Sequence, residues 1–356
     1  MPHIFVAMSG GVDSSTAALL LQQAGYRISG VNLQLLRSSA LGETPACRSL
    51  ADTEDAAQVA RRLGFPLHIL DLSPVFWEEV IQPFVQEYCQ GRTPNPCIVC
   101  NQTIKFGALL DRVRALGGEF LATGHYAQVA HDRASGRYLL KRGLDRSKDQ
   151  SYFLYRLTQD QLAHTLFPLG GLDKTQVRRL AEDHGLVNAR KRDSQDICFI
   201  PGGDYAALIE TVTGAPAPAG DFLDRDGRVL GRHKGLIRYT HGQHKGLGLS
   251  TEEPLYVLDK DPASNTVRLA PDSALWSQTL TAEDANWISI PDLTEPLSVT
   301  VKTRHSQREA PAVAEPLPGG RFRVAFDQPQ RAITPGQAVV LYDGECVVGG
   351  GTICGP

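Results

Sequence analysis

Two thiols lie three residues apart in the stretch Asn-Pro-Cys-Ile-Val-Cys-Asn, where they are Cys97 and Cys100. A pair with this spacing can hold part of a metal site, form a redox pair, or supply one nucleophile, because the thiolate is both the metal ligand and the attacking species. A structural zinc site normally takes four protein ligands as two close pairs. The sequence has no second Cys-x-x-Cys and no His-x₃-His near this one. The pattern therefore disfavours structural zinc and leaves a local disulfide, a redox role and a nucleophilic role open.

A loop rich in glycine and serine, Ser-Gly-Gly-Val-Asp-Ser-Ser, occupies residues 9–15 between a strand-like run at 3–8 and a helix-like run at 14–24. Gly10 and Gly11 let the backbone approach an anion closely, and a helix N-terminus offers N–H groups and the positive end of the helix dipole. The Gly-Lys-Ser/Thr ending of a Walker A loop is absent. The stretch therefore predicts a phosphate-binding loop of another class.

Alternating elements surround this loop through the first 200 residues. Strands are expected at 28–35, 66–72 and 119–123. Helices are expected at 53–63 and, directly after Cys100, at 102–116. A βαβα order is typical of a parallel sheet covered by helices on both faces. The fold class predicted for the N-terminal part is therefore α/β, with a doubly wound parallel sheet.

The pattern changes after residue 200. A helical stretch at 204–213 precedes a Pro/Gly/Ala linker at 214–220, and short strands separated by Gly and Asp turns follow. The expected strands are 256–258 and 266–269, paired as a hairpin, and then 297–303, 322–326, 338–341 and 345–348. We predict three domains: the sheet domain over residues 1–206, a small β-rich domain over 207–275, and a C-terminal β-barrel over 276–356.

The cysteines and the apolar runs indicate the compartment. The seven cysteines are an odd number scattered along the chain, which argues against a secreted disulfide framework and favours a reducing compartment. No apolar run approaches the roughly 20 residues that span a bilayer. The first residues do not show a basic segment followed by an apolar core. We therefore expect a cytoplasmic protein without a membrane partner.

Positive charge is clustered although the formal net charge is -3. Residues 133–156 and 225–245 each carry a formal charge of +5, and residues 174–192 carry +4. Such clusters can bind a polyanion such as a nucleic acid, or they can be solvated faces. The charge pattern by itself leaves both interpretations open.

Several motifs together resemble one family. Ser-Gly-Gly-Val-Asp-Ser is similar to the PP-loop of the ATP pyrophosphatases, which split ATP into AMP and pyrophosphate. Within that superfamily the chain resembles the tRNA-specific 2-thiouridylases through six further motifs, in order along the chain: residues 93–101, 122–127, 148–154, 193–199, 240–248 and 331–337. The resemblance runs from residue 4 to about residue 353.

The resemblance implies a reaction. ATP, with Mg²⁺, adenylates oxygen 2 of the wobble uridine in a tRNA anticodon loop, and a persulfide then attacks carbon 2 and releases AMP. The sulfur comes from a sulfur-carrier protein or a cysteine desulfurase. Cys198 matches the persulfide carrier, and Cys100 matches the nucleophile or resolving thiol. The sheet domain would bind ATP, and the C-terminal barrel would contact tRNA.

The remaining site residues also follow from the resemblance. Those expected around ATP are Ala7, Met8, Ser9, Gly10, Gly11, Val12, Asp13, Ser14, Leu33 and Gly124. Those expected to face the target base are Asn95, Pro96 and Cys97. Those expected to contact tRNA elsewhere are His125, Lys148, Asp149, Gln150, Arg304, His305 and Gln337. Cys47, Cys89, Cys346 and Cys354 lie outside the motifs and are expected to be small hydrophobic residues.

Two residues depart from the family pattern, and three alternatives stay open. Cys97 stands where many relatives carry Asp, and His244 stands where Arg is more usual. Cys97, Cys100 and Cys198 could supply three ligands to a [4Fe–4S] cluster, as in related tRNA-thiolating enzymes, although we favour the persulfide route. A PP-loop ligase acting on a small metabolite and a non-catalytic RNA-binding module are the competing functions.

Overall fold

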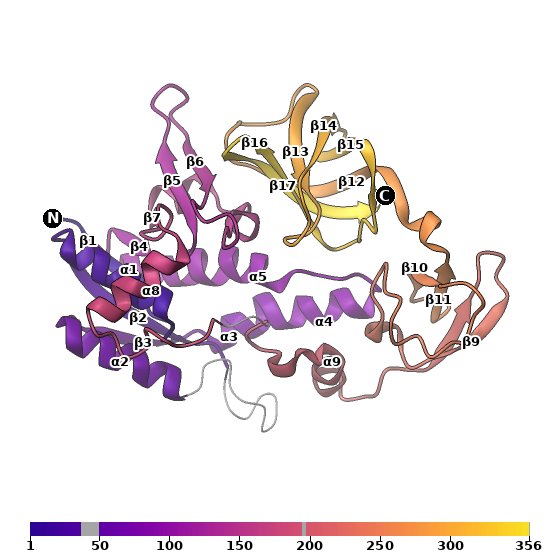
Figure 1. Ribbon diagram of the computed structural model, residues 1–356, viewed down its shortest axis with the longest axis horizontal. Coiled ribbons are helices and arrows are strands. Elements are labelled where there is room, and N and C mark those ends of the chain that lie inside the picture. The colour runs from indigo at the N-terminus through magenta and orange to yellow at the C-terminus, as the bar shows by residue number, and fades with distance from the viewer. Residues whose placement is uncertain (37–49, 194–196, 356) are drawn as a thin grey trace. The chain divides into compact units, whose positions relative to one another are not determined.

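The computed structural model of the chain describes residues 1–36, 50–193 and 197–355 (Figure 1). It divides into two compact units, which are described separately. The first comprises residues 1–80, 96–203 and 344–348, and the second comprises residues 81–95, 204–343 and 349–356. Within the described ranges, no helix combines the length and the apolar character needed to cross a membrane.

The first unit is built on a parallel sheet. Among the described residues its five strands follow the order β3-β2-β1-β4-β7. Their bounds are β1 His3–Ala7, β2 Arg27–Gln34, β3 Leu67–Asp71, β4 Phe120–Ala122 and β7 Thr165–Leu166. All neighbouring pairs are parallel, which confirms the predicted α/β sheet. The strands at 3–8, 28–35, 66–72 and 119–123 are confirmed to within two residues at each end.

Helices pack on the sheet through buried apolar residues. They include α1 Val12–Gln23, α2 Leu50–Leu63 and α8 Lys174–Asp183. Ala17 and Ala18 of α1 pack with Val177 of α8 and with Ile4 and Val6 of β1 in one buried cluster. The packing of α8 against this cluster brings residues far along the chain next to the loop that follows β1.

A long helical segment carries the two motif cysteines. It begins with α5 Pro96–Val99, continues through wide, π-type turns over Cys100–Ala108 and ends with α6 Leu109–Ala115. The sequence predicted a helix starting after Cys100, and that start is wrong. Proline is favoured in the first helical turn because it has no N–H to satisfy there. Cys100 therefore lies inside the helix, and Cys97 lies in its first turn.

Further elements complete the first unit. One continuous helical stretch lies before the cysteine helix in the chain and consists of α3 Ser73–Phe76, π-type turns over Trp77–Ile81 and α4 Gln82–Cys89. Helix α4 belongs to the second unit. An antiparallel hairpin that the sequence did not predict is formed by β5 Ala127–His131 and β6 Tyr138–Arg142. The short helices are Ser151–Leu154, α7 Gln159–Ala163 and Pro201–Gly203.

The second unit begins its β structure with a small sheet. Helix α9 Tyr205–Thr213 precedes it, as predicted. The strand order is β10-β11-β8-β9, with β8 Gly220–Leu223, β9 Val229–His233, β10 Tyr256–Asp261 and β11 Thr266–Ala270. Phe222, Val257 and Val267 form its core. The antiparallel pairing of β10 with β11 confirms the predicted hairpin.

A closed β-barrel occupies the C-terminal part, drawn from orange to yellow in Figure 1. Its strands follow the order β12-β15-β14-β13-β16-β17, and β12 also pairs with β17. Their bounds are β12 Trp276–Trp287, β13 Leu297–Lys302, β14 Ala310–Leu317, β15 Arg321–Arg331, β16 Ala338–Asp343 and β17 Cys346–Gly355. Closure removes exposed strand edges, and the barrel confirms the predicted class of this part. Two single-turn helices, Leu236–Arg238 and Asp272–Leu275, complete the unit.

Candidate active site

The phosphate loop is held open at the start of α1 by a glycine in a left-handed conformation. Gly10 has φ +76°, and a Cβ built on it would lie 2.1 Å from the carbonyl oxygen of Asp52. Gly11 is the N-cap residue, and it has no side chain to satisfy the first N–H groups of α1. The N-terminus of α1 therefore keeps backbone N–H groups that can donate hydrogen bonds to an anion.

Side chains fix the shape of the loop. The Ser9 N–H donates to Ser14 Oγ at 3.1 Å, and Ser14 Oγ donates to the Gly11 carbonyl at 3.1 Å. Asn188 Nδ2 donates to the Gly10 carbonyl at 3.1 Å and to Ser15 Oγ at 2.8 Å. Asn188 is 3% exposed, and sequence reasoning did not select it. These bonds preform the loop before any ligand binds.

Other residues expected around ATP lie in two settings. A Cβ on Gly124 would come within 2.8 Å of the Ser14 nitrogen and the Asp13 carbonyl carbon, so only glycine fits where the chain after β4 passes the loop. Met8 and Leu33 are buried in the core of the unit. The Met8 carbonyl accepts a hydrogen bond from Asn32 Nδ2 at 2.7 Å.

A charged cluster adjoins the loop, and it joins Asp13 and Lys148, which were expected at the site, to Lys174, which the sequence marked only as part of a basic window. Lys174 Nζ donates to Asp13 Oδ1 at 2.7 Å and lies 2.8 Å from Asp193 Oδ1. Lys148 Nζ donates to Asp193 Oδ2 at 2.8 Å, and the Tyr126 hydroxyl donates to Asp13 Oδ1 at 2.9 Å. Burial acts to raise the pKa of Asp193, but hydrogen bonds from Lys148 and Lys174 outweigh it and lower the pKa to about 2.

The three motif cysteines belong to the same unit but differ in exposure. Cys100 is buried, Cys97 is partly buried and Cys198 is exposed. Burial raises the pKa of Cys97, and the negative charge of a Cys198 thiolate raises it further, whereas Lys105 lowers it. Cys97 and Cys198 therefore lie close enough to influence each other. Residues 194–196 of the Cys198 motif, and Cys47, lie outside the described residues.

His125 sits in an aromatic environment that includes Phe106, a residue of the helical segment that carries Cys97 and Cys100. Its ring centroid lies 5.9 Å from those of Phe106 and Phe167, and its Nδ1 is 2.7 Å from Thr123 Oγ1. Burial, followed by the charge of Lys105, holds the pKa of His125 well below its usual value. His125 is therefore neutral at pH 7.

Lys148, in the turn at residues 148–150, belongs to the charged cluster that adjoins the phosphate loop. The other two side chains of this turn form hydrogen bonds inside the protein. Asp149 is buried and accepts hydrogen bonds from the N–H groups of Gly143 and Ser151. Gln150 Oε1 accepts from the Tyr126 N–H at 3.0 Å. These contacts hold the turn in place.

The remaining residues expected at tRNA belong to the second unit. Arg304 Nη2 donates to the Ala332 carbonyl at 2.7 Å, and Gln337 Nε2 donates to the Thr93 carbonyl at 2.7 Å, two residues before Asn95. His305 is exposed. Gln337 thus fixes the segment that leads to the cysteine motif.

The other departure from the family pattern, His244, is also in the second unit. Its ring lies 4.9 Å from that of Tyr256, and its Nδ1 is 3.0 Å from the Leu255 carbonyl oxygen. Both contacts join His244 to the start of β10 in the small sheet.

Most cations of the basic window 174–192 pair with carboxylates. Besides Lys174, these include Arg178 with Asp193 and Arg190 with Glu182. The formal charge of that window therefore overstates the charge that a polyanion could reach.

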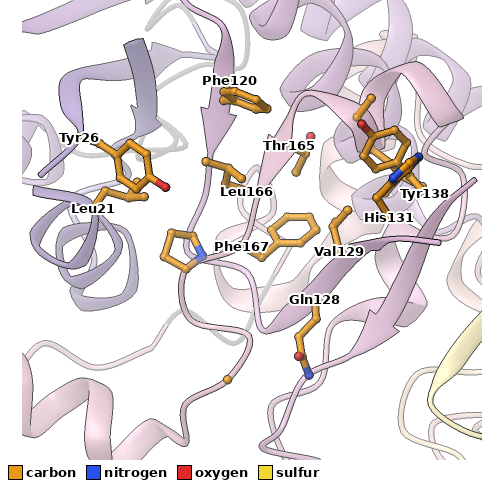
Figure 2. Close-up of a pocket in the computed structure, with 14 residues that line it drawn as sticks. Leu21, Tyr26, Phe120, Gln128, Val129, His131, Tyr138, Thr165, Leu166 and Phe167 are labelled. Carbon is orange, nitrogen blue, oxygen red and sulfur yellow. The ribbon is translucent and has the colours of Figure 1, made fainter. Parts of the chain in front are cut away.

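The first unit also contains a cavity of about 490 Å³, whose lining residues are drawn in Figure 2. Phe120, Leu166 and Phe167 line it together with Val129 and Tyr138 of the hairpin. None of the site residues expected from the sequence lines this cavity. Phe167 lines the cavity and also contacts the ring of His125.

Three family models match the chain. Residues 2–202 match a model described as the tRNA methyl transferase HUP domain, residues 211–271 match the tRNA methyl transferase PRC-barrel domain, and residues 277–353 match the aminomethyltransferase beta-barrel domain. Among solved structures, a 4-thiouridine synthetase–RNA complex with bound ATP aligns with a TM-score of 0.35 and 16% identity, over 56% of this chain and 45% of that one. That likeness is too low to bear on function.

Curated relatives match over nearly their whole length. The chain is 51% identical to the tRNA-specific 2-thiouridylase MnmA of Moorella thermoacetica, over 98% of each chain. It is 48% identical to tRNA-specific 2-thiouridylase MnmA 1 of Caldanaerobacter subterraneus, over 99% of this chain and 97% of the relative. On this identity and coverage, the chain belongs to the family of tRNA-specific 2-thiouridylases.

Proposed function

We propose that the protein is an ATP-dependent tRNA-uridine 2-sulfurtransferase that converts the wobble uridine of tRNA to 2-thiouridine. The observation that carries this is the presence, in one compact unit, of a preformed phosphate loop without a Walker lysine and of three motif cysteines, of which Cys198 lies close enough to raise the pKa of Cys97. The names of the curated relatives support the same activity.

The chemistry divides between the loop and the thiols. An amide-like oxygen is a poor leaving group, so oxygen 2 of the uracil attacks the α-phosphorus of ATP and pyrophosphate leaves. The outer sulfur of a Cys198 persulfide then attacks carbon 2, and AMP leaves with the former oxygen 2. Attack of the Cys100 thiolate on the Cys198 sulfur releases the 2-thiouridine and leaves a Cys100–Cys198 disulfide. An external thiol must reduce that disulfide before the next turnover.

The cofactors are ATP and Mg²⁺. Among the described residues, no group of three or more His, Cys, Asp or Glu side chains is arranged to hold a metal. We propose that the sulfur passes through a persulfide rather than through a [4Fe–4S] cluster held by Cys97, Cys100 and Cys198. Magnesium is commonly bound through substrate phosphates with few protein ligands, so we propose that it enters with ATP.

We propose the following partners and organisation. The substrate is the anticodon loop of a tRNA, with the target base turned out of its stack at a cost of a few kcal/mol. Residues 1–206 carry ATP binding and catalysis, residues 207–275 form the central β-rich domain, and residues 276–356 form the tRNA-contacting barrel. The sulfur donor is a sulfur-carrier protein or a cysteine desulfurase. Thiol chemistry of this kind suits the reducing cytoplasm.

Mass analysis of tRNA nucleosides tests the proposal. Incubation of tRNA with the protein, ATP and a sulfur source should replace one oxygen by sulfur in the wobble uridine. Cys198→Ser and Cys100→Ser should abolish the product and keep tRNA-dependent pyrophosphate release, whereas Cys89→Ser, outside the motifs, should behave as wild type. Pyrophosphate release that does not require tRNA would favour a small-metabolite ligase instead.

A further inference from the structure

The most enclosed cation beside the phosphate loop is Lys174, at the start of α8. Its side chain is 11% exposed, and its Nζ donates to Asp13 Oδ1 at 2.7 Å and to Asp13 Oδ2 at 2.8 Å. The same ammonium lies 5.7 Å from the centroid of the Tyr126 ring. Asp13 is the second residue of α1, so Lys174 lies against the helical turn whose N–H groups would face an anion.

The phosphate loop brings no cation of its own. Residues 9–15 contain neither lysine nor arginine, and Asp13 adds a negative charge. A Walker A loop carries a lysine that reaches the phosphates. In this chain any side-chain cation that joins Mg²⁺ in neutralising a bound triphosphate must come from elsewhere in the fold.

Lys191 is one candidate, and its surroundings disfavour it. Its Nζ donates to the Gly10 carbonyl at 3.3 Å, which places it at the loop. It also pairs with Asp52 and Asp55 of α2. One cation between two carboxylates leaves a formal charge of -1, which repels a phosphate.

The surroundings of Lys174 are less negative. Lys174, Lys148 and Arg178 share the carboxylates of Asp13 and Asp193. A third carboxylate, that of Asp145, accepts a hydrogen bond from the Lys174 backbone N–H at 3.1 Å. Three cations and three anions leave no net formal charge next to the start of α1, against -1 around Lys191. A phosphate therefore meets no net repulsion here, and a partly enclosed ammonium attracts its oxygens more strongly than an exposed one, because solvent screens it less.

We propose that Lys174 contacts the phosphates of ATP and that Asp193 is a positioning residue that holds Lys174 beside the loop. This inference rests on the proposed use of ATP. When the phosphates bind at α1, the Lys174 ammonium exchanges a carboxylate hydrogen bond for one to a phosphate oxygen. It then lies where negative charge develops on the departing pyrophosphate, which is where a fixed cation accelerates the step.

Titration calorimetry of the full chain with ATP, inorganic pyrophosphate and AMP tests the proposal. Lys174→Met should weaken the binding of ATP and of pyrophosphate by about 10- to 150-fold, the range for a hydrogen bond to a charged group. The affinity for AMP should be unchanged, and Lys174→Arg should restore most of the loss. Arg179→Met is the matched control, because Arg179 lies on the same helix and its side chain is 83% exposed.

Two double variants separate contact from indirect effects. Asp193→Asn should weaken ATP binding in the wild-type background and have no further effect in Lys174→Met, because the carboxylate acts through the lysine. Asp13→Asn combined with Lys174→Met should remain weak. Recovery of ATP affinity in that pair would show that Lys174 merely neutralises Asp13, and would overturn the proposal.

An equal loss of AMP and ATP binding in Lys174→Met would also overturn the proposal, because it indicates general damage to the site. These binding measurements use neither tRNA nor a sulfur source. A wild-type protein that binds ATP through Lys174 but forms no 2-thiouridine would contradict the proposed function and leave this inference standing. If the wild-type protein thiolates tRNA but Lys174→Met binds ATP as tightly as wild type does, the proposed function stands and this inference is contradicted.

Discussion

Replacing Gly10 by alanine should damage the phosphate loop in two separable ways. The residue has φ +76°, and an L-residue in the left-handed region pays about 1–2 kcal/mol. The new Cβ would also lie 2.1 Å from the carbonyl oxygen and 2.7 Å from the carbonyl carbon of Asp52. Because both atoms are backbone atoms of α2, no side chain can rotate away, and either the loop or the helix must move.

The overlap adds to the conformational cost. Inserting a methyl group into a packed site typically costs about 1–3 kcal/mol, so Gly10→Ala should lower the free energy of unfolding by about 2–5 kcal/mol. Gly25→Ala is the matched control, because Gly25 ends the same helix with φ +82° and a Cβ there would meet nothing within 4 Å. It should lose only the conformational part, about 1–2 kcal/mol.

Urea unfolding and ATP titration would measure both effects. Gly10→Ala should have the lower unfolding midpoint and should lose ATP binding, because the displaced loop no longer presents the N–H groups of α1. Gly25→Ala should bind ATP as wild type does. If the two variants lost the same free energy and both bound ATP normally, the close contact between Gly10 and α2 would have no role in shaping the site.

Three further results are expected. The pKa of Asp193 is held at about 2, below the ordinary 3.8, so its ion pairs stabilise the fold above pH 3.8 and are lost as the pH falls through 2. The stability difference between wild type and Asp193→Asn, measured by thermal unfolding, should therefore shrink as the pH falls from 3.8 to 2. A constant difference would contradict the assignment of these ion pairs. Lys105 lowers the pKa of Cys97, so Lys105→Met should slow alkylation of Cys97 at neutral pH, whereas Arg112→Met on the same helical segment should not. Peptide mass analysis after timed alkylation measures the rate. Equal alkylation rates in wild type and Lys105→Met would count against this effect of Lys105. Asp149→Ala removes the acceptor of two backbone N–H groups. It should lower the free energy of unfolding, measured with urea, by at least about 1–3 kcal/mol, the penalty for an unsatisfied buried donor. A loss of tRNA affinity at unchanged stability would instead show that Asp149 acts directly on RNA.

Local sequence determined the phosphate loop and the order of the elements around it. Two adjacent glycines between an apolar strand and a helix predict an anion site, because close backbone approach and free N–H groups depend on a few neighbouring residues. The alternation of strands and helices likewise predicted the parallel sheet, since each periodicity is set by local geometry. The start of the cysteine helix was missed because proline at its first position reads equally well as a turn.

Only the tertiary structure decided which charges meet at the loop. Lys174 and Asp13 are separated by 161 positions, and they come together because α8 packs on α1. The same packing sets the pKa of Asp193, through lysines from two distant segments. Burial and ion pairing depend on distances across the fold, which residue types and spacing do not encode, so the sequence marked Lys174 only as part of a basic window and did not pair it with Asp13. The motif cysteines were evident from the sequence, but their different exposures, on which their reactivity depends, were set by the packing of the helix that carries Cys97 and Cys100.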